Sequence, residues 1–269
     1  MEKFRKKLGF VGAGAIAEAW IERLVKHGLC EAESLLATDV RPEALAKLQE
    51  KWRIQTSANN AAAAEFADIV VLAVPPPATL PVLREIRERF QKGQIVTSLA
   101  AAVPLARLEA EVANAAVVRV MPNLPALVGA AFNLVVFSSE ATVEERLEVA
   151  GFLNLLGQWK EVEDASIDAW CALCAVSPTF LLPVMDALAK AARAGGMDEA
   201  EALRGVAQTF AGTSRMVLES GRTPEELKQM IGLRPLKEEA ACQLFSEAYA
   251  EAMARLKGIG ARIGGVVNA

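Results

Sequence analysis

The chain has 269 residues, a formal net charge of −4 and 53% hydrophobic residues, but only one histidine and one tyrosine. A Ser-His-Asp triad would have to use His27 and a tyrosine general acid would have to be Tyr249, so hydrolases and tyrosine-dependent dehydrogenases are disfavoured. The 29 basic and 33 acidic residues indicate neither a nucleic-acid partner nor binding to an anionic membrane. At about 150 residues per domain, the length predicts two domains or one large one.

The four cysteines include the pair Cys171 and Cys174, whose spacing is that of a redox or zinc motif. No second pair and no histidine lies near them in the sequence, so we favour thiols in an apolar core and expect no metal site. The N-terminal residues are charged, unlike a signal peptide, and no apolar run approaches the roughly 20 residues that span a bilayer. We therefore expect a cytoplasmic protein with reduced cysteines and no membrane partner.

Short apolar runs alternate with amphipathic stretches in the first part of the chain, which predicts a parallel sheet with crossover helices. The expected strands are Leu8–Val11, Leu35–Thr38, Ile69–Ala73, Gln94–Thr97, Val117–Val120, Leu134–Phe137 and Gln158–Val162. The expected helices are Ala15–His27, Pro42–Lys51, Ala78–Phe90, Leu105–Val112 and Val143–Leu156. We thus predict an α/β domain over residues 1–163.

Residues 164–269 are rich in Ala, Leu and Glu and predict an all-α second domain. Breaks are expected at Gly195-Gly196, at Gly221–Pro224 and at Gly232–Pro235, and the tail from residue 258 to 269 is expected to be loosely ordered. The segment Phe180–Ala192 is apolar on nearly every face, so it requires burial on all sides. It is either the central helix of a monomeric bundle or a helix that a second subunit covers; we favour a dimer.

The string Gly12-Ala13-Gly14-Ala15-Ile16-Ala17 follows the first strand and opens the first helix. In this strand–turn–helix context the first glycine permits a tight turn, and the second lets the backbone approach a pyrophosphate. The N-terminus of the helix supplies N–H donors for the phosphates. We therefore favour a dinucleotide-binding site over a simple tight turn.

Asp39 stands at the end of the second strand, where a carboxylate typically accepts the ribose hydroxyls of NAD and repels the 2′-phosphate of NADP. Arg41 can instead bind that phosphate or cover the adenine, and Asp39 can be no more than a turn residue before Pro42. NADH and NADPH both stay open as cofactors, with Asp39 favouring NADH.

Ligands of open parallel sheets bind outside the carboxyl ends of the strands, so residues that follow the other strands are expected at the same crevice. These residues are Asn60, Ala73, Val74, Pro75, Ser98, Ala100, Met121 and Asn123. Asn123 has a proline on either side and little backbone freedom. Its amide either holds the nicotinamide carboxamide or a polar group of the substrate, or stabilises an Asx turn.

Several strings of this sequence resemble the pyrroline-5-carboxylate reductase family, over a match from about Leu8 to Lys257. Besides the glycine string, they are Ala67–Val74, Ser98–Val103, Arg119–Ala126, Gln208-Thr209 with Gly212, Leu218–Gly221 and Pro224–Leu227. The resemblance implies a Rossmann domain joined to a helical domain that forms a homodimer, and higher assembly of dimers is common in the family. It also implies reduction of a cyclic imino acid to proline by a nicotinamide cofactor.

The sequence departs from the family where the substrate binds. The family carries G-S-G-P-A where this chain has Ala175–Thr179, S-P-G-G-T-T where it has Ile231–Lys237, and a strand-end lysine where it has Pro75. By the resemblance, the candidate substrate residues are Met121, Asn123, Val176, Ser177 and Arg234, and the candidate catalytic residues are Ser177, Thr179 and Lys237. Arg234 and Lys237 either bind a carboxylate by charge or are solvated charges before a helix.

Hydride transfer to a cyclic imine depends mainly on the orientation of the imine against the cofactor and on the delivery of one proton, and it needs few reactive side chains. This requirement suits a chain with one histidine. Two alternatives stay open. One is a relative that binds dinucleotide but has lost the reaction and acts as a sensor or regulatory protein. The other is a dehydrogenase of the 3-hydroxyisobutyrate type, which would carry a Lys and an Asn on the first helix of the second domain; Trp170–Ala189 contains neither.

Overall fold

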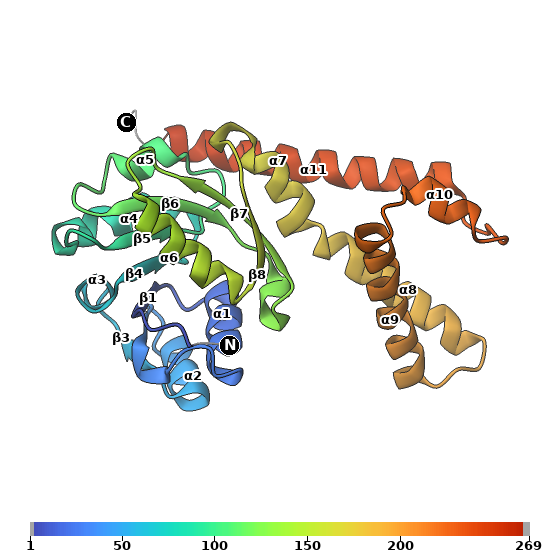
Figure 1. Cartoon of the computed structure of the whole chain (residues 1–269), viewed down its shortest axis with the longest axis horizontal. Coiled ribbons are helices and arrows are strands. Elements are labelled where there is room, and N and C mark those ends of the chain that lie inside the picture. The colour runs from blue at the N-terminus through green and yellow to red at the C-terminus, as the bar shows by residue number, and fades with distance from the viewer. Residues whose placement is uncertain (1–2, 266–269) are drawn as a thin grey trace. The chain divides into compact units, whose positions relative to one another are not determined.

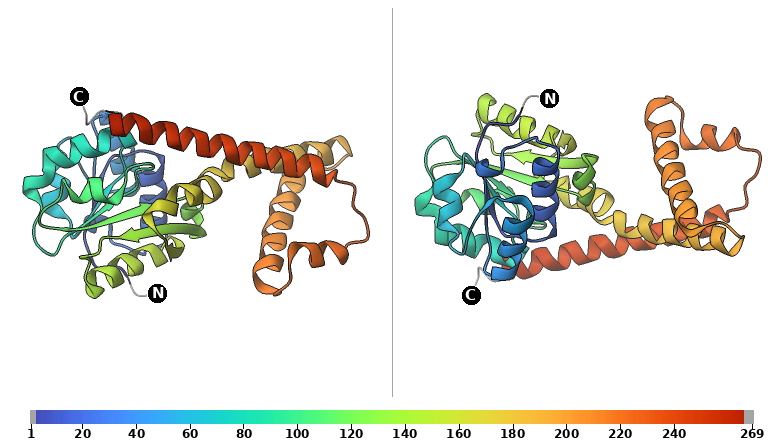
Figure 2. Two further views of the ribbon diagram at one scale, coloured as in Figure 1. Left: turned by 90° about the horizontal axis from the view of Figure 1, so that it is seen from above. Right: turned by 90° about the horizontal axis from the view of Figure 1, so that it is seen from below.

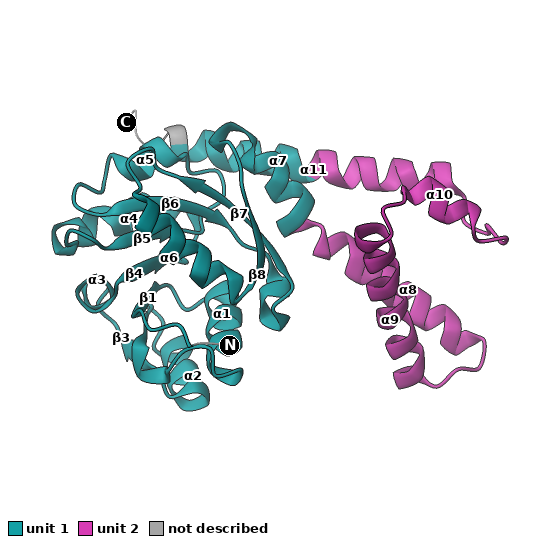
Figure 3. Ribbon diagram, in the orientation of Figure 1, with its two compact units in different colours: residues 1–175, 252–269 teal, residues 176–251 magenta. Residues whose placement is uncertain are grey.

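The structure is a computed structural model that describes residues 3–265. The chain divides into two compact units, one formed by residues 1–175 together with 252–269 and the other by residues 176–251 (Figure 3). The sequence instead predicts a boundary between domains at residue 164. That boundary does not coincide with the limits of the compact units, and it stays a prediction about functional domains.

Within residues 3–265, eight strands form one sheet in the order β3-β2-β1-β4-β5-β6-β7-β8 (Figure 1). They are β1 (Leu8–Val11), β2 (Leu35–Thr38), β3 (Gln55–Ser57), β4 (Ile69–Leu72), β5 (Ile95–Ser98), β6 (Ala116–Met121), β7 (Ala131–Phe137) and β8 (Gly157–Glu161). The seven predicted strands are confirmed to within three residues at each end. The short edge strand β3 escaped prediction because it has three polar residues and no apolar alternation.

One pair of strands corrects the expectation of an all-parallel sheet. β7 runs antiparallel to β6, whereas every other neighbouring pair is parallel in the part of the chain that the structure describes. The connection from Pro122 to Ala130 is shorter than the dozen or so residues that a parallel crossover needs, so the chain can only turn back.

Helices cover both faces of the sheet because the strands carry apolar side chains on both sides. Leu8 and Phe10 belong to one core, and Val11 belongs to the other. The first core takes residues from α1 (Ala15–Lys26), α2 (Pro42–Trp52) and α6 (Val143–Asn154), and the second takes them from α3 (Ala61–Phe66), α4 (Pro76–Ile86) and α5 (Leu105–Glu109). Short 3-10 helices lie at Ala32–Ser34, Arg87–Arg89, Leu124–Val128 and Asp164–Ser166.

The chain from residue 164 to 265 is all helical, as predicted. It contains α7 (Ile167–Cys171), a π-helix (Ala172–Val176), α8 (Pro178–Ala194), α9 (Glu199–Glu219), α10 (Pro224–Gln229) and α11 (Glu238–Gly265). The three predicted breaks are confirmed as the connections that separate α8 from α9, α9 from α10 and α10 from α11. The Thr223 hydroxyl and the Glu226 carboxylate cap each other's backbone N–H groups, which starts α10 after its break.

The expectation of a loosely ordered tail is wrong for residues 258–265, and residues 266–269 lie outside the described part of the chain. α11 continues to Gly265, and its last turns carry Ile259 and Ile263 into the second core of the sheet. Figure 2 shows this end of α11 beside the helices of the same compact unit from two sides. Burial of the two isoleucines offsets the low helix propensity of the glycines around them.

The helical run Asp164–Ala194 corrects the expectation that no apolar segment approaches the length needed to span a bilayer. It is 31 residues long, and its apolar window has a mean hydropathy of 1.7, so by length and composition alone it could cross a membrane. Only 11% of that window is buried within one chain, and Leu181 and Leu182 lie exposed on α8. A helix that is covered by a second protein subunit passes the same test of length and composition.

Arg119 anchors the start of this run to the sheet. Its side chain is 3% exposed, and it donates to Asp164 at 2.6 Å and to Asp168 at 2.9 Å. The second oxygen of Asp164 accepts the N–H of Leu105 at 3.1 Å, which joins the start of α5 to the same cluster. One buried cation on β6 thus positions two helices.

Candidate functional site

The glycine loop between β1 and α1 passes very close to the end of β4. Gly12 has a φ of +103° and donates its N–H to the Thr38 carbonyl at 2.7 Å. A Cβ at Gly12 would lie 2.6 Å from the Ala73 carbonyl oxygen, so only glycine fits this approach. A Cβ at Gly14 would meet nothing within 4 Å, so open space lies over the backbone at the N-terminus of α1.

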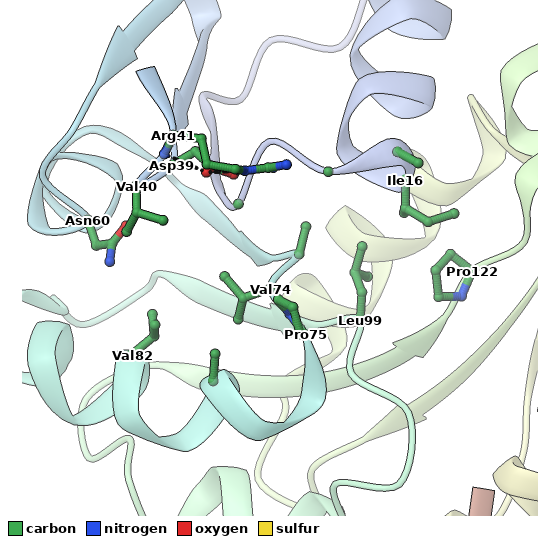
Figure 4. A pocket seen from close by; sticks show the side chains of 15 residues that line it. Ile16, Asp39, Val40, Arg41, Asn60, Val74, Pro75, Val82, Leu99 and Pro122 are labelled. Carbon is green, nitrogen blue, oxygen red and sulfur yellow. Dashed lines mark hydrogen bonds and ion pairs between the residues drawn. The ribbon is translucent and has the colours of Figure 1, made fainter. Parts of the chain in front are cut away.

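A cavity of about 700 Å³ opens at this loop (Figure 4). Ten predicted cofactor residues line it: Gly12, Gly14, Ala15, Ile16, Asp39, Arg41, Asn60, Ala73, Val74 and Pro75. The sequence interpretation missed Val40, Ala78, Val82 and Leu99, and Pro122 lines the cavity beside them. Ala78 and Val82 are four residues apart on α4, a spacing that puts both on one helix face and could have revealed them.

The two ends of the cavity differ in chemistry. Asp39, Val40, Arg41 and Asn60 gather at one end in Figure 4, and Ile16, Leu99 and Pro122 at the other, with Val74 and Pro75 between them. The first end carries charged and amide groups, and the second is apolar. An elongated ligand with a polar nucleoside at one end and a flat ring at the other fits such a gradient.

Two of the helices that begin beside this cavity, α1 and α4, differ in the phosphate donors that they offer. α4 is preceded by Pro75 and opens with Pro76 and Pro77, and none of these prolines has a backbone N–H. α1 begins after Gly14 with Ala15 and Ile16, whose N–H groups have no partner in the preceding turn of an α-helix. Of these two, only the N-terminus of α1 offers free N–H groups of the kind that bind an anion.

Asp39 is held in one place by four donors. Its Oδ2 accepts the N–H of Ala13 at 2.7 Å and Nη2 of Arg41 at 3.0 Å, and its Oδ1 accepts the N–H and Nε of Arg41, both at 2.9 Å. The hydrogen bond from the Arg41 guanidinium, helped by the two backbone N–H groups, lowers the pKa of Asp39 to about 2 against the opposing effect of burial. Since this folded-state pKa lies below the unfolded value, the stabilisation is present above about pH 4 and is lost as the pH falls toward 2.

The side chain of Asn60 is also held by hydrogen bonds. Its Oδ1 accepts the Thr38 hydroxyl at 2.9 Å, and its Nδ2 donates to the Glu85 carboxylate at 3.2 Å. These bonds connect the end of β2, the start of α3 and α4 at the polar end of the cavity. This end is thus preorganised before any ligand arrives.

Four predicted cofactor residues do not line the cavity: Ala13, Ser98, Ala100 and Asn123. Ser98 and Ala100 are buried, and the Ser98 hydroxyl accepts the Ala100 N–H at 3.3 Å inside the turn. Leu99 lies between them and lines the cavity in their place, because neighbouring extended residues point to opposite sides. Ala13 is buried, and its N–H is taken by Asp39.

The amide of Asn123 joins two segments of the chain. Its Oδ1 accepts the Phe132 N–H at the start of β7, and its Nδ2 donates to the Cys174 carbonyl in the π-helix, both at 3.2 Å. Neither bond is the local one of an Asx turn. Loss of this amide would leave two backbone groups without their partner, at a cost of about 1–3 kcal/mol for each group that stays buried. Met121, two residues earlier, is 4% exposed at the end of β6.

The remaining candidates lie at or beyond the π-helix, in the second compact unit. Val176 ends the π-helix, Ser177 precedes α8, and the Thr179 hydroxyl donates to the Val176 carbonyl at 2.7 Å. Arg234 lines a separate hollow of about 450 Å³ and lies 3.9 Å from Glu225. Lys237 is exposed and does not line that hollow.

The cysteine pair has the character of core thiols. Cys171 is buried and Cys174 is half-buried. Burial, reinforced by the negative charge of Asp168, raises the pKa of Cys171 to about 11, and burial also raises the pKa of Cys174. Within residues 3–265 no group of three or more His, Cys, Asp or Glu residues is arranged to hold a metal ion.

Two domain families match separate parts of the chain. The family described as NADP oxidoreductase coenzyme F420-dependent matches residues 7–102, and the family described as pyrroline-5-carboxylate reductase dimerisation matches residues 164–259. The first match contains the glycine loop, Asp39, Arg41 and Asn60. The second contains the helical run and the candidates Ser177, Arg234 and Lys237.

Relatives match most of the chain. It is 34% identical over 265 residues to the pyrroline-5-carboxylate reductase of Methanosarcina acetivorans, covering 95% of this chain and 98% of the relative. It is 31% identical to that of Escherichia coli, over 84% of each chain. A structure of pyrroline carboxylate reductase from Plasmodium falciparum with NADP bound has a TM-score of 0.85 at 21% identity, covering 96% of this chain and 100% of the other. A Coxiella burnetii pyrroline-5-carboxylate reductase has a TM-score of 0.77 at 25% identity, covering 94% and 98%.

Proposed function

We propose that this chain, which belongs to the pyrroline-5-carboxylate reductase family, reduces the C=N bond of 1-pyrroline-5-carboxylate with NAD(P)H to give proline. The observation that carries the proposal is the cavity at the glycine loop, with Asp39 and Arg41 at its polar end. The open space over Gly14, where a Cβ would meet no atom within 4 Å, fits a pyrophosphate against the backbone.

The residues around the cavity divide the work of holding the cofactor. The loop from Gly12 to Ile16 and the N-terminus of α1 hold the pyrophosphate, and Asp39, Arg41 and Asn60 hold the adenosine end. Ile16, Leu99 and Pro122 form the apolar wall for the nicotinamide end. The bound cofactor supplies the hydride that reduces the C=N bond. The chain's own task is to align the imine and to exclude water, which suits an apolar wall.

The substrate side draws on different residues. We propose that Arg234 attracts the substrate carboxylate by charge, and that Ser177, Thr179 and Lys237 are the candidates for the group that delivers one proton to the imine nitrogen. Val176 and Met121 would contribute apolar contacts. Asn123 acts by holding the π-helix through the Cys174 carbonyl, so its contribution is to position the segment that leads to Ser177.

The test of this function is turnover with both cofactors. Purified protein with 1-pyrroline-5-carboxylate is expected to oxidise NADH or NADPH in proportion to the proline formed, measured by nicotinamide absorbance and by amino-acid analysis. The control replaces the imine with proline, which has no C=N bond to reduce. No cofactor oxidation above that control with either cofactor would remove the reductase proposal and favour the non-catalytic dinucleotide-binding alternative.

We also propose that the protein works as a homodimer through its helical segment, in the cytoplasm. The match to a dimerisation family over residues 164–259 and the exposed apolar face of α8 support the dimer. The reduced state of the four free cysteines fits the proposed compartment. The resemblance also implies that dimers assemble into larger oligomers. A measurement of the molecular mass in solution tests both the dimer and this larger assembly.

A single charge on the exposed face of α8 is expected to break the dimer. Leu182 is 59% exposed in one chain, and Leu182→Glu would place a carboxylate in the apolar interface, shifting the solution mass from dimer to monomer. Leu147→Glu is the matched control, because Leu147 is 67% exposed on α6 in the other compact unit. Light scattering after size-exclusion chromatography gives both masses. A dimer that persists in Leu182→Glu, or that Leu147→Glu breaks instead, would contradict the proposed interface.

A further inference from the structure

The carboxylate of Asp39 has no acceptor capacity left. An ionised carboxylate offers about four lone-pair sites, and here two backbone N–H groups and two N–H groups of the Arg41 guanidinium occupy them. The side chain is 8% exposed, so water does not reach it freely. A ribose diol could therefore bind Asp39 only by displacing Arg41 or Ala13.

Arg41, by contrast, keeps donors for a ligand. Two of the five N–H groups of its guanidinium donate to Asp39, which leaves three, and its side chain is 54% exposed where it lines the cavity. The charges that act on it are those of Asp39 and Glu43. Asp39 fixes the plane of the guanidinium from one side, so the free donors are held without further loss of side-chain entropy.

Resting on the proposed cofactor site, we propose that Arg41 is the residue that binds the adenosine 2′-phosphate. Asp39 is its positioning residue and the anchor of the glycine loop, rather than an acceptor for the ribose. The carboxylate at the end of β2 then no longer excludes NADPH, because Arg41 neutralises it and presents a bidentate donor pair to the phosphate. The protein binds NADPH at least as tightly as NADH, although the position of Asp39 in the sequence favours NADH.

Fragments of the cofactor test this inference without turnover. Adenosine 2′,5′-bisphosphate and 5′-AMP differ only in the 2′-phosphate, and calorimetric titration gives the affinity of the full-length protein for each. We expect the bisphosphate to bind more tightly to the wild type. In Arg41→Gln this advantage falls by roughly 10- to 100-fold, while the affinity for 5′-AMP stays within about 2-fold, because one charge-assisted phosphate contact is lost.

Asp39→Asn separates the two roles of the carboxylate. The amide keeps the shape of the side chain but replaces one acceptor oxygen with a donor, so it no longer holds the Arg41 guanidinium as the carboxylate does. We expect the preference for the bisphosphate over 5′-AMP to fall, while the affinity for 5′-AMP changes by less than about 10-fold. Two results together would overturn the inference and make Asp39 the ribose acceptor. The first is that Asp39→Asn weakens the binding of 5′-AMP by about 10-fold or more, and the second is that Arg41→Gln leaves the affinity for the bisphosphate unchanged. Thermal melting of both variants checks that they are folded.

The outcome also separates this inference from the proposed function. If the enzyme forms proline but Arg41→Gln has the same preference between NADPH and NADH as the wild type, the proposed function stands and this inference is wrong. Failure of both nucleotides to bind the wild type would overturn the inference together with the assignment of the cavity. Loss of 2′-phosphate discrimination in Arg41→Gln, with or without turnover, supports the inference.

Discussion

Gly12→Ala is expected to destabilise the protein by about 2–4 kcal/mol and to weaken NADPH binding by roughly 10- to 100-fold. The new Cβ would lie 2.6 Å from the Ala73 carbonyl oxygen, and alanine rarely adopts a φ of +103°. The end of β4 or the glycine loop must therefore move, which also moves the N–H groups that face the phosphates. Thermal melting without cofactor and fluorescence titration with NADPH measure the two effects.

Gly14→Ala is the matched control, because it makes the same chemical change two residues later. Its Cβ would meet nothing within 4 Å, and Gly14 has a φ of −79°, which alanine adopts without strain. The melting temperature should stay at the wild-type value, but NADPH binding should weaken, since the methyl group fills space reserved for the cofactor. A wild-type melting temperature in Gly12→Ala would contradict the close approach of the loop to β4.

Arg119→Met is expected to lower the free energy of unfolding by about 3–5 kcal/mol. The cation is 3% exposed and neutralises Asp164 and Asp168, so its removal leaves two carboxylates facing an apolar side chain. The start of the helical run and the start of α5 lose their common anchor. Urea denaturation at one fixed protein concentration is the appropriate measurement, because dimerisation makes the apparent stability depend on concentration.

Arg84→Met is the control for the loss of a positive charge in an ion pair. Arg84 lies 2.7 Å from Glu111 with half of its side chain exposed, so its removal should cost less than about 1 kcal/mol. Adding Asp164→Asn and Asp168→Asn to Arg119→Met should recover part of the lost stability by removing the unpaired charges. Equal effects of Arg119→Met and Arg84→Met would show that the buried cluster is no stronger than a surface pair.

The local features of the sheet domain were predictable from sequence because they depend on neighbours in the chain. The apolar run of β1, the glycine loop and α1 are consecutive, and each favours the structure that the next one needs. The positions of Val74 and Pro75 at the cavity followed from the rule that parallel strands end at one edge. The same reasoning misplaced Ser98 and Ala100 by one residue, since it identified the crevice but not which side chains point into it.

The helical half illustrates a different limit. Its breaks were predictable because Gly and Pro interrupt helices locally, but the end of α11 was not, because its helix depends on Ile259 and Ile263 reaching a core made of distant strands. The length of the helical run Asp164–Ala194 was not predicted either. Polar residues interrupt its apolar sequence, whereas in the structure the π-helix connects its parts into one continuous run.

The sequence by itself determined the fold class, the family and the residues around which the cavity forms, because hydrophobic periodicity, glycine spacing and strand ends are properties of neighbouring residues. Only the tertiary structure decided how the polar side chains are used. Asn123 is bonded to Phe132 and to Cys174, which is 51 positions away, and Asp39 is bonded to Ala13, 26 positions before it. A hydrogen bond depends on a distance of about 3 Å between two atoms, and sequence spacing cannot specify that distance once the chain has folded back on itself.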